Sequence, residues 1–538
     1  MSKIIVYGEE SRKSLKAGVD AVGDAVRSTI GPKGRNVAFD RGWGGPTITN
    51  DGASIAREIV LKNPMQNMGA NLAKEAAEKT NSDAGDGTTT SVVLMQAIIS
   101  EGMRKIELGV NAVGVRNGLE KAAQVAIAEL KKIAKPIKTG EETIQVATIS
   151  AESAEIGQII ADTISKLGEH AVITVEESPT VGVTSEVSQG MEFDRGFISP
   201  YLATDPERME AEYKDVPILV TDMKIGSVKE IVPFLEKVMS TGKKEVVIIA
   251  DDVVGDALST FILNKMRGVF SILAVKAPGF GNRKAEYLQD IAALTGATVI
   301  SNETGMKLEQ IELTDLGSAS RVVSTKDKTT IVGGKGDEKI IKSRIAHAKK
   351  ELETQDSKHD QLKTEERIAK LSGGVGVIKV GAATETATKY LKLKVEDAVN
   401  AVKAALEEGI VAGGGSALLT AAIAIRKEIA KPTDLHMTTD EIMGFSILAS
   451  SLEAPLKYIA INAGQGDGSK VVETVKEMGK NAGYDALKGV YVEDMIVAGI
   501  IDPVKVTRSA IENSVSTAGI LLTTEVAMVE EPKEEKTV

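Results

Sequence analysis

The stretch NSDAGDGTTTSVVLM, residues 81–95, carries the chain from a polar loop into a strongly apolar segment that continues to Ile99. An apolar segment of this length is typical of a buried helix, so the loop ends at a helix N-terminus. Such a terminus offers unpaired N–H groups and a positive dipole end, which suit an anion. Gly87 lets a backbone approach closely, and the carboxylate of Asp86 suits Mg²⁺ held against phosphate oxygens. A glycine turn with a threonine N-cap is the alternative, although a cap needs one hydroxyl and three threonines follow here.

The composition predicts a large protein of several domains. The chain has 538 residues, 42% of them hydrophobic, and no run reaches the length of a membrane span. A net charge of −11 argues against nucleic acid as the main partner. The absence of cysteine and of a signal-like N-terminal apolar run fits a reducing cytoplasm. The four histidines are far apart in the sequence, which argues against a histidine metal site.

Hydrophobic periodicity separates the two ends of the chain from its middle. The ends are predicted to be mainly helical, with helices at 66–79, 89–106, 115–133, 388–408 and 442–463 and strands at 4–7, 37–40, 47–49 and 520–526. The middle alternates strands and helices, with strands at 218–220, 246–250, 272–275 and 298–300 and helices at 228–239, 256–266 and 284–294. Such alternation is typical of an α/β domain. The fold class predicted for the whole chain is therefore multidomain α+β.

Three motifs together carry a family resemblance. They are TIGPKG at 29–34, DGTTT at 86–90 and AALEEGIVAGGG at 404–415. In this order and at this spacing they resemble the group I chaperonins, the GroEL family, over nearly the whole chain. The resemblance implies a helical equatorial ATP-binding domain at 1–134 and 408–538, an intermediate hinge domain at 135–189 and 375–407, and an inserted α/β apical domain at 190–374. Gly190 and the pair at 373–374 are interpreted as pivots, because glycine accepts large φ/ψ changes.

The resemblance also implies an ATP site that uses Mg²⁺, with K⁺ as a further candidate cation. Asp86 would hold the metal, while Asp51 and Asp397 would act on the attacking water. From the residues alone, Asn-Asp-Gly at 50–52 is an ordinary turn and Asp397 a solvated helix carboxylate. The ATP-binding residues implied by the family are Thr29, Ile30, Gly31, Pro32, Asn50, Asp86, Gly87, Thr88, Thr89, Thr90, Gly414, Asp485, Ala486, Leu487 and Asp502. Asn50 stands where the family often has Lys, and Asp485 stands where Asn is common.

A client-binding surface is the second implied site. For the residues at 232–235 and 258–263, helical periodicity alone would indicate an ordinary helix core, whereas the resemblance implies an exposed apolar groove for non-native polypeptides, with a neighbouring segment at 197–202. The implied residues are Phe197, Ser199, Tyr201, Leu202, Val232, Leu235, Leu258, Ile262 and Leu263. An aromatic residue is usual in the family where Leu202 stands. An exposed apolar patch suits varied clients, because burial of apolar area needs no specific geometry.

The sequence therefore predicts a cytoplasmic chaperonin subunit that converts ATP and water to ADP and phosphate. Its expected partners are unfolded polypeptides, a small GroES-type co-chaperonin and further copies of itself. These copies are expected to form seven-membered rings that stack in pairs. A metabolic kinase is one alternative, weakened because no Walker A or dinucleotide fingerprint is present. A non-catalytic scaffold and a group II chaperonin with a built-in lid are the others.

Overall fold

The structure is a computed structural model that describes residues 2–40, 47–137, 140–168, 172–206, 208–355, 357–430 and 437–531. The glycine-rich turn expected at 41–46, the charged tail from 532 onward, His170 and His436 lie outside the described residues. The chain divides into two compact units, which are described separately. Unit 1 comprises Met1–Asp162, Val175–Thr184 and Lys379–Val538, and unit 2 comprises Thr163–Thr174 and Ser185–Ile378.

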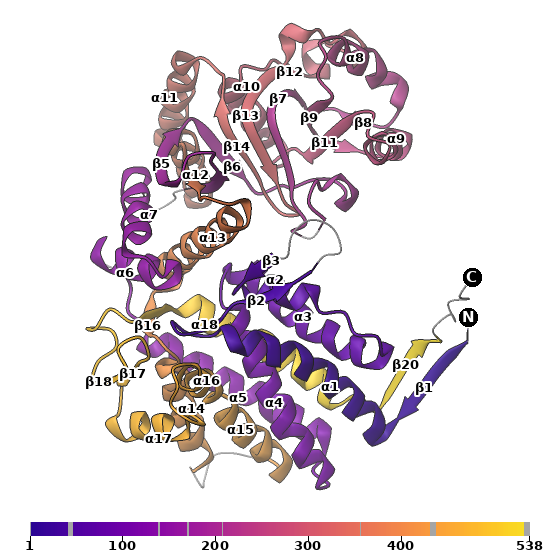
Figure 1. Ribbon diagram of the computed structural model, residues 1–538. Coiled ribbons are helices and arrows are strands. Elements are labelled where there is room, and N and C mark those ends of the chain that lie inside the picture. Colours follow the sequence, from indigo (N-terminus) through magenta and orange to yellow (C-terminus); the bar gives the residue numbers. More distant parts are fainter. Residues whose placement is uncertain are drawn as a thin grey trace. The chain divides into compact units, whose positions relative to one another are not determined.

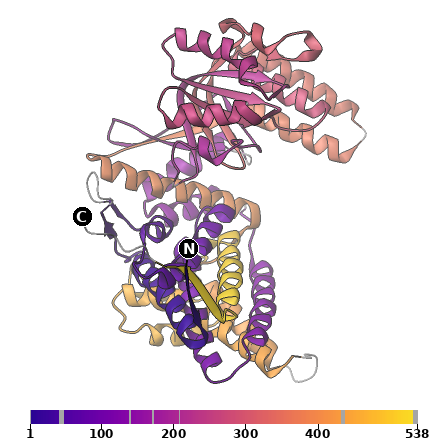
Figure 2. The ribbon, with the colours of Figure 1, turned by 90° about the vertical axis from the view of Figure 1, so that its right-hand side faces the viewer.

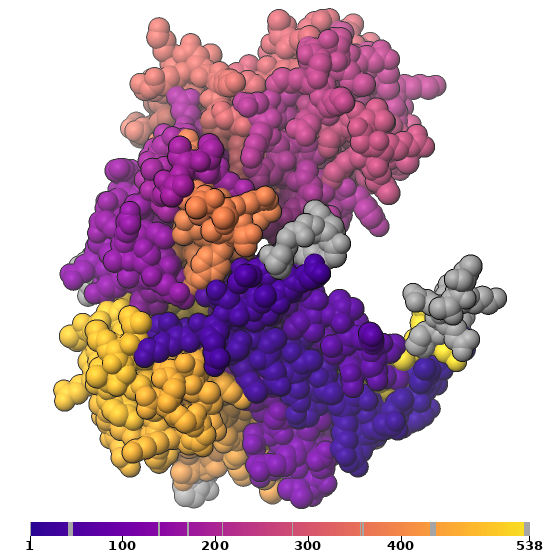
Figure 3. Space-filling view, viewed as in Figure 1, coloured from indigo at the N-terminus to yellow at the C-terminus, as the bar shows by residue number. Residues whose placement is uncertain are grey.

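Unit 1 is mainly helical and is built from both ends of the chain (Figures 1 and 3). Its helices are α1 (Gly8–Val26), α2 (Gly52–Glu58), α3 (Pro64–Ala84), α4 (Thr88–Glu107), α5 (Ala112–Ile133), α6 (Gly140–Ala151), α13 (Glu385–Glu408), α14 (Ser416–Ile429), α15 (Thr439–Ser451), α16 (Ala454–Asn462), α17 (Ser469–Met478) and α18 (Val504–Leu522). Its strands form two-stranded antiparallel pairs, which are β1 (Lys3–Tyr7) with β20 (Val526–Glu530), β2 (Val37–Phe39) with β3 (Thr47–Thr49), β16 (Ile410–Ala412) with β19 (Ile501–Pro503), and β17 (Gly483–Asp485) with β18 (Val490–Val492).

One apolar core joins these helices. It is almost wholly aliphatic and includes Leu15, Leu94, Leu119, Leu448 and Ile511, all at most 1% exposed. Helix α18, from the C-terminal end, packs against α4 and α5 from the N-terminal end, and Figure 2 shows it in yellow beside them. The core therefore fixes the DGTTT turn, which precedes α4, against segments that are 300 or more residues distant in sequence.

The strand expected at 520–526 is wrong. Helix α18 continues to Leu522, and the strand β20 begins only at Val526. The residues Ile, Leu, Thr and Val favour strands, but Leu521 and Leu522 extend the buried face that Val515 and Ala518 begin, and this helical burial outweighs the propensity. The following strand was expected to pair with a neighbouring subunit, whereas β20 pairs with β1 of the same chain, from Val526 opposite Tyr7 to Glu530 opposite Lys3.

Unit 2 contains the α/β part of the chain. Its main sheet has the order β11-β9-β7-β13-β14-β6, and β12 also pairs with β7. The strands are β6 (Gly190–Phe193), β7 (Ala211–Thr221), β9 (Glu245–Ala250), β11 (Ser271–Lys276), β12 (Val299–Ile300), β13 (Gly317–Ser324) and β14 (Thr329–Gly334), with a short parallel pair β8 (Lys224–Ile225) and β10 (Asp252–Val253). The helices are α8 (Val228–Ser240), α9 (Gly255–Met266), α10 (Asn282–Thr295), α11 (Glu338–Thr354) and α12 (Lys358–Gly373).

The boundaries between the units fall within four elements, which are α7 (Ala154–Leu167), β4 (Val172–Glu177), β5 (Gly182–Ser188) and β15 (Val375–Gly381). The longer segment of unit 2, Ser185–Ile378, begins near the predicted apical boundary at 190. Most of the predicted intermediate residues belong to unit 1. A Cβ atom on Gly190 would lie 2.4 Å from the Ile331 carbonyl oxygen, so close packing within the sheet also explains this glycine. In the part of the chain that the structure describes, no helix is long and apolar enough to cross a membrane.

Candidate functional site

The DGTTT turn forms the N-terminus of α4, as the sequence predicts. Gly87 is the N-cap with φ of +83°, a left-handed conformation that favours glycine. Its N–H donates to Asp86 Oδ1 at 2.5 Å, and the Ser150 hydroxyl lies 3.5 Å from Asp86 Oδ2. Substitution of Gly87 would bring a Cβ atom to 2.5 Å from Val506 of α18. The Asp86 carboxylate is therefore held at the start of a long helix, where backbone N–H groups favour an anion.

Asp51 is brought to the same place by close packing of α2 on the start of α4. A Cβ atom on Gly52 would lie 2.5 Å from Thr89 Oγ1. Asp51 is also the N-cap of α2, because its Oδ1 accepts from Ala53 N at 3.1 Å and its Oδ2 from Ser54 N at 2.9 Å. Each oxygen keeps a second lone pair. The carboxylate is thus oriented by the helix that it caps.

Asp397 completes a cluster of three carboxylates. It lies on α13, one turn after Lys394. The pKa of Asp397 is raised well above its ordinary value, first by burial and then by the charges of Asp51 and Asp86. Burial, followed by the charge of Asp51, raises the pKa of Asp86, while the Lys394 ammonium lowers the pKa of both groups. Lys394 is itself bound to Glu152 at 2.5 Å. The cluster therefore holds more negative charge than nearby cations balance.

Asp502 is a fourth carboxylate beside this cluster. It lies in β19 opposite Val411 of β16. Burial, followed by the charge of Asp86, raises the pKa of Asp502 to about 7, although a hydrogen bond from the Gly414 N–H lowers it. A Cβ atom on Gly413 would lie 3.0 Å from Asp502 Oδ1, and Gly414 has φ of +64°. The triple-glycine turn at 413–415 therefore brings backbone close to this carboxylate.

An apolar wall lies next to the triple-glycine turn. Ile30, Tyr484 and Ala486 belong to one buried cluster, to which Ile459 also contributes. Asn462 holds the turn at 30–32 in place, because its Nδ2 donates to Ile30 O at 2.9 Å. A Cβ atom on Gly414 would lie 4.0 Å from Tyr484 O. The TIGPKG turn and the segment that follows from β17 (Gly483–Asp485) are thus brought together around one apolar cluster.

Several predicted ATP-binding side chains are occupied by local bonds. The Thr29 hydroxyl donates to Val26 O at 2.8 Å. Asp485 Oδ1 accepts from the amides of Leu487 at 3.1 Å and Lys488 at 3.0 Å, so this carboxylate stabilises its own turn. These residues remain candidates through their backbone atoms. Pro32 and Leu487 are exposed.

Asn50 has a hydrogen-bond partner within unit 1. Its side chain forms a hydrogen bond with the hydroxyl of Tyr390, on α13. The strand end that carries Asn50 is thereby joined to the helix that carries Asp397. Three further residues of the site were missed in the sequence, namely Lys394, Ser150 and Asn462. Only Lys394 had a signal, because residues three apart on a helix share a face and it precedes Asp397 by three.

The donor set fits Mg²⁺ held together with phosphate oxygens. Among the residues that the structure describes, no group of three or more His, Cys, Asp or Glu side chains is arranged to hold a metal ion alone. Mg²⁺ typically uses one or two carboxylates and takes its other ligands from phosphates and water. Asp86, fixed beside the N-terminus of α4 by the Gly87 N–H, offers such a carboxylate.

The predicted client residues are only partly exposed in unit 2. Tyr201 is 72% exposed and Leu263 is 46% exposed. Val232, Leu235, Leu258 and Ile262 are half-buried on α8 and α9. Phe197, Ser199 and Leu202 are buried, at 6%, 8% and 0% exposed, so their assignment to an exposed groove is wrong for this conformation. Their side chains fill the space beneath the surface; Leu202, for example, belongs to the same core as Phe234 and Phe261.

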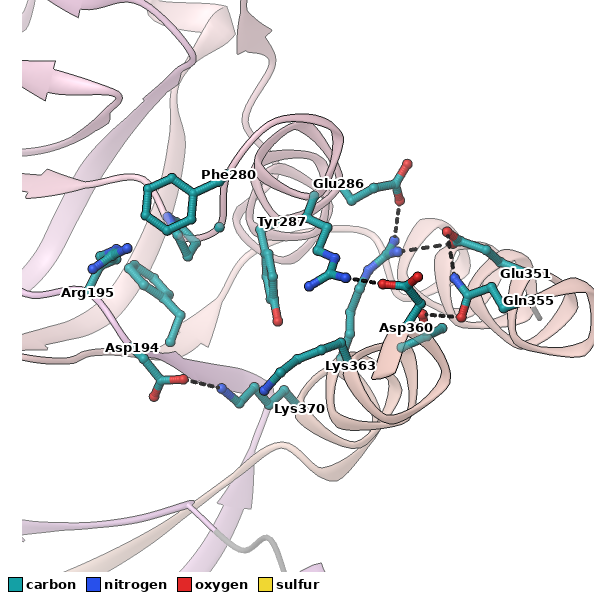
Figure 4. Close-up of a pocket in the computed structure, with 16 residues that line it drawn as sticks. Asp194, Arg195, Phe280, Glu286, Tyr287, Glu351, Gln355, Asp360, Lys363 and Lys370 are labelled. Carbon is teal, nitrogen blue, oxygen red and sulfur yellow. Dashed lines mark hydrogen bonds and ion pairs between the residues drawn. The ribbon is translucent and has the colours of Figure 1, made fainter. Parts of the chain in front are cut away.

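A pocket of about 590 Å³ lies elsewhere in unit 2 and contains none of the predicted residues (Figure 4). It is lined by charged side chains from α10, α11 and α12, and these are paired with one another. Arg367 binds Asp290 at 3.0 Å, Glu286 at 2.7 Å and Glu351 at 3.3 Å, and Lys370 binds Asp194 at 3.2 Å. These mutual pairs fasten α12 to α10 and α11, and they leave little charge for a ligand.

Comparisons with known proteins agree with this geometry. The family model for the TCP-1/cpn60 chaperonin family matches residues 22–532. Among solved structures, the chain is similar to the chaperonin gp146 of the Pseudomonas aeruginosa bacteriophage EL 2, crystallised in the presence of ATP-BeFx. The TM-score is 0.68 at 21% sequence identity, over 98% of this chain and 100% of that one. At this identity the likeness establishes a shared fold.

Proposed function

Because this chain belongs to the TCP-1/cpn60 chaperonin family, we propose that it hydrolyses ATP at the carboxylate cluster of unit 1 and uses that reaction to bind and release non-native polypeptides. One observation supports the proposal above the rest. Asp51, Asp86 and Asp397 come from three separate segments, yet they converge at the N-terminus of α4 with their negative charge uncompensated. The similar phage chaperonin was crystallised in the presence of ATP-BeFx, which agrees with a nucleotide at this site.

Each carboxylate has a distinct part in the proposed reaction. Bound Mg²⁺ would supply positive charge between Asp86 and the phosphate oxygens. The backbone N–H groups at Thr88 to Thr90 would donate hydrogen bonds to the phosphate oxygens. Asp397 would take a proton from the attacking water, and its raised pKa brings it closer to the working pH of a general base. Asp51, fixed by the backbone of α2, would orient the same water.

The nucleoside would lie against the apolar wall. Ile30 and Ala486 offer apolar contact, and Asp502, beside the triple-glycine turn, offers an acceptor for a ribose hydroxyl. Burial of the Asp485 carboxylate in its own turn leaves the base to backbone groups at 484–486. K⁺ remains a candidate second cation.

Client binding is proposed for the exposed part of α8, α9 and the segment near Tyr201. Leu263 and Tyr201 present apolar area to solvent there, and such area favours partners without a fixed shape. Closure of a chamber by a GroES-type co-chaperonin, a seven-membered ring in stacked pairs and a cytoplasmic location follow from the family resemblance alone and stay predictions.

The test is to separate the two activities. Leu263→Ser is expected to weaken capture of a chemically denatured protein while ATP hydrolysis continues. A matched control is Leu313→Ser. Leu313 is a leucine of unit 2 that is 40% exposed and lies outside α8 and α9. Retained capture in Leu263→Ser would contradict the client surface. Transfer of phosphate to a metabolite rather than to water would favour the kinase alternative.

A further inference from the structure

Lys265 lies on the inward side of α9, near the end of the proposed client surface. It follows the fully buried Phe261 by four residues, so the two share one face of the helix. Its neighbours Leu263 and Met266 are 46% and 77% exposed. A lysine side chain at such a position can lay its aliphatic stem along the core and carry its ammonium to the edge of the helix.

The ammonium of Lys265 binds two carbonyl oxygens of one short segment. Nζ donates to Tyr201 O at 3.2 Å and also to Ala203 O. These carbonyls lie on either side of Leu202, at the end of the 3-10 helix η2 (Pro200–Leu202). The carbonyls that end a helical turn lack partners within the turn, and a cation is a suitable donor to them.

The segment is therefore held at three points. Leu202 is fully buried in the core beneath α9, and Lys265 binds the backbone on both sides of it. Tyr201, whose carbonyl is the first of these points, has a ring that is 72% exposed. We propose that Lys265 is a positioning residue of the client surface, which holds η2 against α9 so that Tyr201 is presented there as an ordered aromatic contact.

The environment of Lys265 agrees with this role. Burial lowers the pKa of its ammonium, so the side chain gives up water contact to reach the two carbonyl groups. The exchange is favourable only if those bonds form, since a desolvated ammonium without acceptors is costly. Ordering Tyr201 before a client arrives also reduces the conformational entropy that binding would otherwise remove.

This inference rests on the proposed function. Its test measures two things separately, namely the contact of Lys265 with the Tyr201 and Ala203 carbonyls, called the clamp below, and the capture of a client. The chain contains no cysteine, so Tyr201→Cys supplies a unique position for a nitroxide spin label. In that background we expect a sharper, more mobile spectrum with Lys265→Met, and a spectrum close to the parent with Lys265→Arg, which keeps a charged donor. In the unlabelled protein, Lys265→Met should weaken capture of a denatured protein by about threefold or more, and Lys265→Arg should restore it.

Lys349→Met, at an exposed lysine of α11 outside the proposed client surface, serves as the matched control and should change neither readout. If Lys265→Met unfolds the chain, Lys265→Gln, which keeps a neutral donor, should show intermediate label mobility. An unchanged spectrum in the methionine or glutamine variant would overturn the clamp, whatever happens to capture. If the unsubstituted protein captures no denatured protein while the label responds as expected, the proposed client function fails and the clamp stands.

Discussion

Two groups of acidic side chains in this molecule have opposite arrangements. In unit 2, Asp290 is 0% exposed, yet Arg344 binds it at 2.8 Å and Arg367 at 3.0 Å. In unit 1, burial and then the charges of Asp51 and Asp86 raise the pKa of Asp397, Lys394 lowers it, and Glu152 also binds that lysine. Burial of a carboxylate is stable when arginines pair with it. Carboxylates that gather without such partners have perturbed pKa values, which are typical of functional sites.

The comparison predicts the largest loss of stability for a substitution in the paired network of unit 2. Arg367→Met should leave Asp290 buried with one guanidinium fewer and should destabilise the docking of α12 by about 3 kcal/mol. Hydrogen–deuterium exchange over 338–373 measures this, and ATP hydrolysis should hardly change. Lys363→Met, which removes an exposed pair with Glu366, is the control and should cost at most about 1 kcal/mol. Equal protection in both variants would show that the buried network does not stabilise the helices.

Asp397→Asn should slow ATP hydrolysis by about 100-fold or more, because the amide cannot accept the proton from water. Nucleotide affinity should stay within about twofold, since the side chain keeps its size. Phosphate release and fluorescent nucleotide binding check the two quantities. Glu385→Gln, an exposed carboxylate at the start of the same helix, is the control. Normal turnover in Asp397→Asn would remove it from the reaction.

Asp86→Asn should weaken Mg²⁺-dependent nucleotide binding by about tenfold or more, which corresponds to about 1.4 kcal/mol. The physical reason is the loss of the carboxylate that Mg²⁺ would share with phosphate. Isothermal titration calorimetry with nucleotide, first in Mg²⁺ and then in EDTA, separates the metal-dependent affinity from the metal-independent affinity. An undiminished Mg²⁺ effect would mean that another residue holds the metal.

Asp502→Asn should change the stability of the chain by an amount that depends on pH. The pKa of Asp502 is about 7 in the folded chain and ordinarily 3.8, so between these values the folded state binds more protons than the unfolded state. Stability from this group is therefore lost as the pH rises from about 4 to about 7. At pH 8 the variant should be more stable than the parent, and at pH 5 the difference should shrink. Thermal unfolding at both pH values measures this, and a pH-independent difference would contradict it.

The sequence predicted the site better where short motifs act through backbone than where distant side chains act together. Gly87 and the start of α4 follow from the DGTTT letters, and the helix with Asp397 follows from its periodicity. The partners of Asn50 and the role of Asn462 depend on contacts between residues 340 and 432 positions apart, which no local pattern records. For the same reason, the resemblance that assigned Leu202 to the client surface did not show that its side chain is buried.

The central claim is that the carboxylate cluster of unit 1 is completed by a divalent cation and phosphate. The most direct measurement is release of inorganic phosphate from ATP by the purified full-length chain, with Mg²⁺ and with excess EDTA. We predict sustained release with Mg²⁺ and almost none with EDTA. An absence of release with Mg²⁺, or the same rate in EDTA, would contradict the account.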